Sequence, residues 1–261
     1  MKFKIVSIAF LIITLTLLFF IVREQASVWL LVLLFVVYIH LLVLGSIFIQ
    51  WNFYIKSIHS VSEFLPEAPI HHHTKKICLT FDDGIHPVHT ATTLQILRNK
   101  NVKAHFFVIG KNIEGNEQLL KEMYQDGHQI GNHSFNHSWN FDLRSSTDMQ
   151  KEIEDTNKSI QAVTGVKPQI FRPPYGVTNP NLAKAIQKTN MLSMGWNLRS
   201  MDTVAKSSEM LLQKLIKKTR SNSIILLHDR CEITVEVLTQ YIDYCLTEGF
   251  TFVTLKCPNE A

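Results

Sequence analysis

Two adjacent aspartates, Asp82 and Asp83, follow a short apolar run in the stretch LTFDDGIHP of residues 79–87. Neighbouring carboxylates repel each other, and neither gains packing energy at the end of a strand. A chain benefits from such a pair where the two charges do different work, one binding a cation and the other accepting a proton. The doublet therefore raises the question of which other polar groups could share a site with it.

Four further polar clusters also follow apolar runs. They are His133-Ser134-Phe135-Asn136-His137, Arg172-Pro173-Pro174-Tyr175-Gly176, the single residue Asp202, and His228-Asp229. Each cluster alone has an ordinary explanation, such as a turn, a solvated histidine pair or a linker. If the preceding runs are parallel strands, however, all five clusters fall at carboxyl ends, where α/β folds gather their chemistry. Five such coincidences favour one shared site.

The residue types in these clusters fit a hydrolytic metal centre. His133 and His137 are four residues apart, so both rings can face one ion, and one carboxylate of the doublet completes a His₂Asp set. Three protein ligands leave positions open for water and substrate, as in catalytic zinc sites. The other carboxylate could then take a proton from the attacking water, and His228 could protonate the leaving group.

Short apolar runs alternate with amphipathic segments from about residue 75 onward. We expect strands at Ile77–Phe81, Ala104–Ile109, Gln129–Asn132, Gln169–Phe171, Leu192–Asn197, Ile224–Leu227 and Thr251–Leu255. Helices are expected between them, at Thr90–Lys100, Asn116–Gln125, Ser146–Val163, Asn181–Thr189, Ser207–Thr219 and Ile233–Thr247. This alternation predicts an α/β fold with parallel pairing, as a barrel or a doubly wound sheet.

The ordered motifs LTFDDGIHP, FFVIG, IGNHSFNH, FRPPYG and IILLHD resemble the polysaccharide deacetylase (NodB-homology) family of carbohydrate esterases. The match covers about residues 75–257. The resemblance implies a distorted (β/α)7 barrel and the removal of N- or O-acetyl groups from sugars. It also implies one divalent metal ion, with Zn expected first and Co, Mn or Ni as alternatives.

The resemblance assigns roles to matching residues. Asp82 resembles the general base, and the residues similar to the metal ligands are Asp83, His133 and His137. Arg172 resembles the residue that orients the base, and Asp202 the acid that tunes the catalytic histidine, His228. The remaining matches concern the substrate: Tyr175 for a backbone N–H in the oxyanion hole, and Leu226 for the wall around the acetate methyl group.

Four positions depart from the family pattern. Arg199 stands where an acid is frequent, Thr203 replaces a pocket-wall tryptophan, Ile85 replaces a proline, and His105 replaces a threonine. None of these changes removes a metal ligand or a proton carrier. They alter the shape and polarity of the sugar site, so the resemblance predicts the chemistry better than the substrate.

The first fifty residues predict a membrane anchor. Residues 5–22 and 26–49 are almost entirely apolar, and as helices they would reach roughly 27 and 36 Å against a hydrocarbon core of about 30 Å. Trp29, Trp51 and Tyr54 lie where an aromatic belt is expected. The first segment could instead be a signal peptide, although no small-x-small cleavage site follows it. One or two transmembrane helices are therefore expected.

Composition limits the remaining classes. The net charge of +4 lies mostly in residues 1–60, which leaves a nearly neutral domain and argues against nucleic acid as a partner. The four cysteines have neither CxxC nor framework spacing, which predicts unpaired thiols. We expect three segments: an anchor at 1–55, a linker at 56–74 that contains His71-His72-His73, and a catalytic domain at 75–257.

These observations lead to one main hypothesis and two rivals. The main one is a membrane-anchored N-deacetylase of N-acetylglucosamine-containing wall polysaccharide, with peptidoglycan first and chitin-like oligomers second. The rivals are a non-catalytic membrane sugar-binding protein on the same scaffold and an enzyme that removes O-acetyl groups. The expected partners are the polysaccharide and the lipid bilayer, and no protein partner is predicted.

The side of the membrane is predicted from two opposing arguments. Lys2 and Lys4 precede the first apolar segment, and the positive-inside rule would place them in the cytoplasm together with a domain carried by two spans. Wall polysaccharide lies outside the membrane. A single inserted helix would satisfy both arguments, and we expect an extracytoplasmic catalytic domain.

Overall fold

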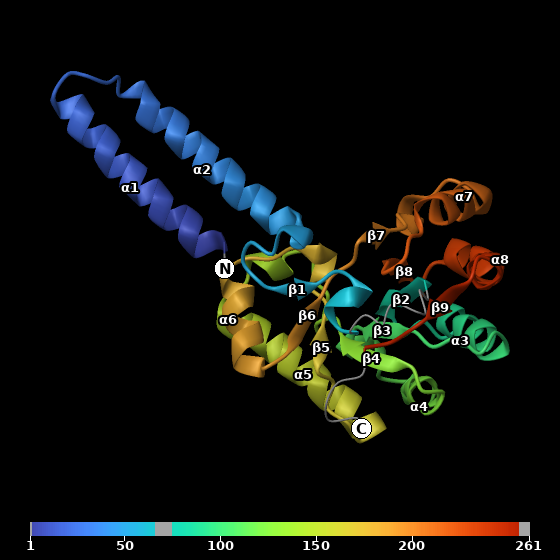
Figure 1. Ribbon diagram of the computed structural model, residues 1–261. Coiled ribbons are helices and arrows are strands. Elements are labelled where there is room, and N and C mark those ends of the chain that lie inside the picture. Colours follow the sequence, from blue (N-terminus) through green and yellow to red (C-terminus); the bar gives the residue numbers. More distant parts are fainter. Residues whose placement is uncertain (1, 66–74, 256–261) are drawn as a thin grey trace.

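The structure is a computed structural model that describes residues 2–65 and 75–255. The two apolar segments form a helical hairpin, α1 (Lys2–Val22) and α2 (Trp29–Ile47), which projects from an α/β domain (Figure 1). By length and composition both helices are long and apolar enough to cross a membrane. Their outer surfaces expose many large apolar side chains, including Ile5, Leu11 and Leu33.

The domain is built on a nine-stranded sheet whose paired strands all run parallel. The order is β1-β6-β5-β4-β3-β2-β8-β7, and β9 pairs with the start of β2. The strands are β1 (Ser57–Ile58), β2 (Lys75–Gly84), β3 (His105–Val108), β4 (Gln129–Asn132), β5 (Ile170–Phe171), β6 (Leu192–Met194), β7 (Leu198–Arg199), β8 (Ile224–His228) and β9 (Phe250–Phe252). This curled sheet confirms the predicted α/β class, and the seven expected strands all have counterparts.

Six helices follow strands of this sheet, as the sequence predicted. They are α3 (His89–Asn99), α4 (Glu117–Gln125), α5 (Ser146–Thr164), α6 (Pro180–Thr189), α7 (Ser208–Lys218) and α8 (Glu232–Thr247). Three of them begin with a side-chain cap, in which Ser145, Asn179 and Ser207 accept a backbone N–H of the first turn. Helix α5 ends at Gly165, whose φ of 77° suits a left-handed cap.

Two short strands were not predicted. β1 lies in the segment expected to be a linker, yet it pairs with β6, and the Ser57 and Ser193 hydroxyls are 2.7 Å apart. β7 lies just beyond Asn197, where the expected fifth strand ended; that strand stops at Met194 and the chain resumes pairing beside β8. Both strands contain two residues, which is too short for a hydrophobic period to identify. His71-His72-His73, which were assigned to the linker from the sequence, lie outside the described residues.

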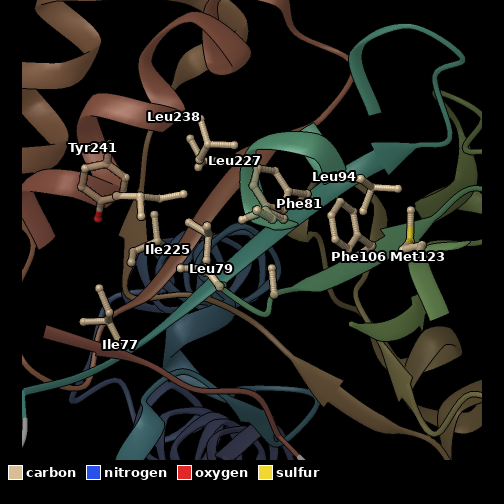
Figure 2. Packing of buried hydrophobic residues seen from close by; sticks show 14 of the residues in the cluster. Ile77, Leu79, Phe81, Leu94, Phe106, Met123, Ile225, Leu227, Leu238 and Tyr241 are labelled. Atoms are coloured by element: carbon tan, nitrogen blue, oxygen red, sulfur yellow. The ribbon is translucent and has the colours of Figure 1, made fainter. Parts of the chain in front are cut away.

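The main core lies where β2, β3 and β8 meet helices α3 and α8. Leu79 and Phe81 of β2 pack with Ile225 and Leu227 of β8 and with Tyr241 of α8 (Figure 2). All five side chains are almost completely buried, and each such burial contributes roughly 1.5–3 kcal/mol. This packing fixes the position of β2, whose last three residues are Asp82, Asp83 and Gly84.

The three cysteines in the described residues are unpaired. Cys78, Cys231 and Cys245 are free thiols, as predicted, and Cys257 lies outside the described residues. Cys78 and Cys245 are buried in the core, and burial raises the pKa of each thiol, to about 12 and about 11 respectively. Both thiols therefore remain protonated and behave as small apolar groups.

The hairpin joins the domain through direct packing. The amide of Phe3 donates to the carbonyl of Phe53 at 3.1 Å, and the amide of Thr178 donates to the carbonyl of Ser46 at 3.0 Å. Gly45 makes this approach possible, because a Cβ there would lie 2.4 Å from the Phe53 ring. The start of α1 and the end of α2 thus both contact the α/β domain.

Candidate active site

The predicted polar clusters converge at the carboxyl ends of the strands. Asp82 and His228 are register partners on the adjacent strands β2 and β8, and Arg172 directly follows β5. A pocket of about 510 Å³ opens at this edge, and its lining includes the doublet, both histidines of the 133–137 cluster, Tyr175, Leu226 and His228. The structure thus brings these residues together at one edge of the sheet.

Three side chains of the pocket lie close enough together to hold one metal ion. Asp83, His133 and His137 offer donor atoms that lie within 4.8 Å of one another. The Nε2 atoms of His133 and His137 are each 3.4 Å from Asp83 Oδ1. Two imidazoles and a carboxylate on one face suit a divalent cation such as zinc, so the donor chemistry fits the expected metal.

A hydrogen bond from Nδ1 of His133 determines which of its ring nitrogens faces the ligand set. Its Nδ1 lies 2.8 Å from the backbone carbonyl of Arg172. A carbonyl oxygen can only accept, so Nδ1 carries a proton, and Nε2 is the ring nitrogen that faces Asp83. Burial alone would lower the pKa of His133, but the neighbouring Asp82 and Asp83 charges raise it overall.

The loop that carries both histidines is not helical. His137 has a φ of 49° and Ser134 a φ of 65°, so the chain turns sharply between the two rings. The buried carboxylate of Glu152 on α5 holds this loop by accepting the amides of Phe135 and Asn136 at 2.9 and 2.7 Å. The i, i+4 spacing predicted that the rings could share an ion, whereas the turn and its acidic support were not predicted.

Asp82 is held by a buried arginine. Arg172 is 0% exposed, and its Nη1 donates to Asp82 Oδ1 at 2.7 Å and to the Thr80 hydroxyl at 2.8 Å. The other nitrogens donate to the carbonyls of Met194 and Gly195. Because every part of the guanidinium is engaged, Asp82 is kept in one orientation, with Oδ2 facing the pocket side where His133 lies 3.8 Å away.

A second acidic residue orients His228. Asp202 Oδ1 lies 2.8 Å from His228 Nδ1, while Oδ2 accepts the His228 amide at 2.6 Å and the Thr234 hydroxyl at 2.7 Å. Burial would lower the pKa of His228, but the Asp202 hydrogen bond and charge raise it overall. Asp202 therefore favours the protonated form of the imidazole.

Sequence reasoning missed Arg230 and gave no role to Asp229, which it had identified only as a member of the His228-Asp229 cluster. Arg230 donates from Nε to Asp83 Oδ2 at 2.8 Å, so the ligand carboxylate already has a cationic partner. Burial would raise the pKa of Asp83, but His133 and the other nearby histidines hold it well below its ordinary value. Asp229 is fully buried and accepts the Thr90 hydroxyl at 2.6 Å. Burial raises its pKa to about 7.

Gly84 permits the close approach of Asp229 to β2, because a Cβ at Gly84 would lie 2.5 Å from Asp229 Oδ2. The short motif HDR after β8 was the available signal for Asp229 and Arg230, since it continues the strand end that carries His228.

The remaining predicted residues line the open part of the pocket. Tyr175 has a φ of 59° and is 48% exposed, and its ring centre lies 4.7 Å from that of His137. Leu226 is buried beside Trp196 in the pocket wall. Arg199 and Thr203, two of the four departures from the family pattern, also line the pocket, whereas a third, His105, is buried with its Nε2 accepting the Leu255 amide.

Comparisons with known proteins agree on one family. The family model described as polysaccharide deacetylase matches residues 70–194. The chain is 31% identical over 191 residues to the peptidoglycan-N-acetylglucosamine deacetylase PgdA of Listeria monocytogenes, covering 73% of this chain and 40% of PgdA. It is 32% identical to the chitooligosaccharide deacetylase of Azorhizobium caulinodans over 165 residues, covering 63% of this chain and 78% of that protein.

A solved structure with a similar fold belongs to a pseudoenzyme. A CE4-family pseudoenzyme from Bacillus anthracis matches with a TM-score of 0.64 and 27% identity, covering 70% of this chain and 64% of that chain. The family therefore includes a pseudoenzyme on the same fold. The state of the site residues, rather than the fold, must decide whether a member is active.

Proposed function

Because the chain belongs to the polysaccharide deacetylase family, we propose that it is a metal-dependent hydrolase that removes acetyl groups from N-acetylglucosamine residues of a wall polysaccharide. Peptidoglycan is the first candidate substrate and chitin-like oligomers are the second. The observation that carries the proposal is that one pocket brings together three groups: a possible ligand set, a carboxylate paired with arginine, and a histidine oriented by a carboxylate.

Asp83, His133 and His137 would hold the cation, with zinc first and Co, Mn or Ni as alternatives. When bound, a divalent cation polarises a carbonyl oxygen and lowers the pKa of water. His133 is prepared for this role by its bond to the Arg172 carbonyl. His137 is prepared by burial, which lowers its pKa to about 4 and keeps its ring neutral above that pH.

Asp82 acts as the general base in this proposal. Arg172 occupies its Oδ1, which leaves Oδ2 to accept a proton from the attacking water. The water oxygen then bonds to the acetyl carbon and the carbonyl oxygen becomes an oxyanion. The Tyr175 amide would donate to this oxyanion, and Leu226 would pack against the acetyl methyl group.

His228 acts as the general acid. Its Nδ1 faces Asp202, so Nε2 is free to carry the proton that the departing amine needs. As the carbon–nitrogen bond breaks, the proton passes from His228 to the sugar nitrogen, and acetate and a free amine are the products. Asp202 stabilises the imidazolium before this step, in the way that a buried carboxylate orients histidine in hydrolytic triads.

Two alternatives remain distinct from this proposal. A non-catalytic sugar-binding protein on the same scaffold draws on the similarity to a pseudoenzyme. It is disfavoured because the ligand set and both proton-carrying groups are present together. An O-deacetylase would use the same residues, since the base, the acid and the ligand set do not depend on whether the leaving atom is nitrogen or oxygen.

Acetate release distinguishes these functions. The full-length protein in detergent or lipid is incubated with chitooligosaccharide, peptidoglycan and acetylated xylan, with and without a chelator. We expect acetate from the first two and its loss after chelation. Release from xylan alone would replace N-deacetylation with O-deacetylation, and no release from any substrate would favour the sugar-binding protein.

We also propose that α1 and α2 anchor the protein in the cell membrane, with the domain on the extracytoplasmic side where wall polysaccharide lies. Both ends of the hairpin contact the domain, at Phe3–Phe53 and Ser46–Thr178, which supports two spans rather than the single inserted helix considered from the sequence. Protease added to intact protoplasts should digest the domain. A domain that stays protected until lysis would place it in the cytoplasm instead.

A further inference from the structure

A second hollow adjoins the active-site pocket and is lined by positive charge. This hollow, which we call the cationic groove, has a volume of about 610 Å³. Its lining consists of Asn197, Leu198, Arg199, Met201, Lys214, Lys217, Lys218 and Arg220. Five of these eight residues are cations and none is acidic, although the domain as a whole is nearly neutral.

The charges of the cationic groove are not neutralised within the described part of the chain. None of the ion pairs formed there involves any of the five cations. Burial and the nearby charge of Lys218 lower the pKa of Lys214, as expected for a cation that faces other cations. The groove therefore has an unsatisfied preference for an anion.

Helix termination explains only part of this charge. Lys217 and Lys218 lie in the last turn of α7, where cations complement the helix dipole. Arg220 donates to the carbonyls of Lys217 and Thr219 at 2.7 Å and so caps the same helix. Arg199, however, lies on β7, so the helix end does not account for its position beside the lysines.

Arg199 connects the cationic groove to the active-site pocket, because it lines both. On the sheet Arg199 is the register partner of Leu226, and Leu226 precedes His228 by two residues on β8. Its guanidinium carbon lies 5.7 Å from the Trp196 ring centre, within the pocket wall. Lys111 adds a further cation to the pocket lining. A ligand in the pocket that reaches Arg199 therefore also reaches one side of the groove.

We propose that the substrate is an anionic glycan, and that the cationic groove binds a carboxylate or phosphate carried close to the N-acetylated sugar. This inference rests on the proposed deacetylase function and narrows its substrate class. It separates charged wall glycan from neutral chitin-like oligomers, which share the N-acetyl group and have nothing to offer the groove. Carboxylate and phosphate share the chemistry that the five cations recognise.

The test compares three substrates with the full-length protein. They are a neutral N-acetylglucosamine oligomer, peptide-free peptidoglycan strands bearing lactyl carboxylates, and an N-acetylglucosamine oligomer bearing phosphate monoesters. We expect a higher kcat/KM for a charged substrate, with a KM that rises with salt because screening weakens the contact. The better of the two charged substrates identifies the natural anion. Equal kcat/KM for all three would overturn the inference while leaving deacetylation intact, whereas no acetate from any would remove the proposed function itself.

A charge-reversal pair locates the effect. Lys217→Glu/Lys218→Glu changes two exposed side chains of the groove, and it should reduce the preference for charged over neutral substrate roughly tenfold, about 1.4 kcal/mol. The control Lys121→Glu/Lys188→Glu changes net charge equally at exposed sites on α4 and α6. The control should keep the wild-type preference. An unchanged preference in the groove variant, or an equal loss in the control, would refute a local subsite.

Discussion

Arg172 offers a sharp test of the physical account, because it is a fully buried charge with several partners. The substitution Arg172→Met keeps much of the side-chain volume and removes the donors to Asp82, Met194 and Gly195. Removing one member of a buried ion pair leaves an uncompensated charge, which typically costs about 3–5 kcal/mol. We therefore expect a loss of about 4 kcal/mol in the free energy of unfolding, a large share of a domain's total of about 5–15 kcal/mol.

A double-mutant cycle separates the charge from the packing. In an Asp82→Asn background the carboxylate is absent. Arg172→Met should then lower the free energy of unfolding only because the Met194 and Gly195 carbonyls lose their donor, by about 1–3 kcal/mol. The coupling energy between the two positions should then be about 2 kcal/mol. Urea unfolding of the full-length protein in detergent can be followed by tryptophan fluorescence, since Trp196 lies 5.7 Å from the guanidinium carbon.

A matched surface pair serves as the control. Arg98 Nη2 lies 2.7 Å from Asp126 Oδ2, the same distance as the buried pair, but its side chain is 46% exposed. Solvent screens this pair, so Arg98→Met should have a much smaller effect. If Arg172→Met cost the same with Asp82 as with Asn at that position, the unpaired carboxylate would not be the source of the loss and the reasoning would be wrong.

Three further outcomes follow from the site. His133→Ala should abolish bound metal and nearly all acetate release, and a variant that kept both, by metal analysis and turnover, would remove it from the ligand set. Asp202→Asn removes the anion that raises the pKa of His228, so the high-pH limit of kcat should move to lower pH; an unmoved limit would separate the two residues. Glu152→Gln weakens the support of the Phe135 amide and should lower metal affinity about tenfold in a zinc titration, whereas unchanged affinity would make Glu152 irrelevant to the metal.

The sequence predicted helices and strands well where several consecutive residues carry a hydrophobic pattern. The strand Gln129–Asn132 and the end of helix α4 at Gln125 agree with the prediction at the residue level. Strands β1 and β7 escaped because two residues hold no period, and tertiary pairing alone creates them. The linker was expected to begin at residue 56 because Pro66 and Pro69 dominate its composition, while the pairing of Ser57 depends on a distant strand.

In the site, too, residues within motifs were predicted, and residues brought in by tertiary packing were not. Residues in ordered motifs, such as His133 and Arg172, could be placed because strand ends of a parallel sheet meet at one edge. Glu152 was not identified, because it lies mid-helix in α5 and its role comes from packing against the histidine loop. The cationic groove was also not predicted, since Arg199 and Lys214 come from separate elements and only the fold brings them together.

The central claim is that the adjacent aspartates do different work. Asp82, paired with Arg172, is the base, and Asp83, beside the two histidines, is the ligand. Metal content and acetate release measured together on Asp82→Asn and Asp83→Asn test this directly. Asp82→Asn should retain its metal and lose turnover by roughly 10²–10⁴-fold, whereas Asp83→Asn should lose the metal. The reverse pattern of metal retention, or wild-type turnover by Asp82→Asn, would contradict the account.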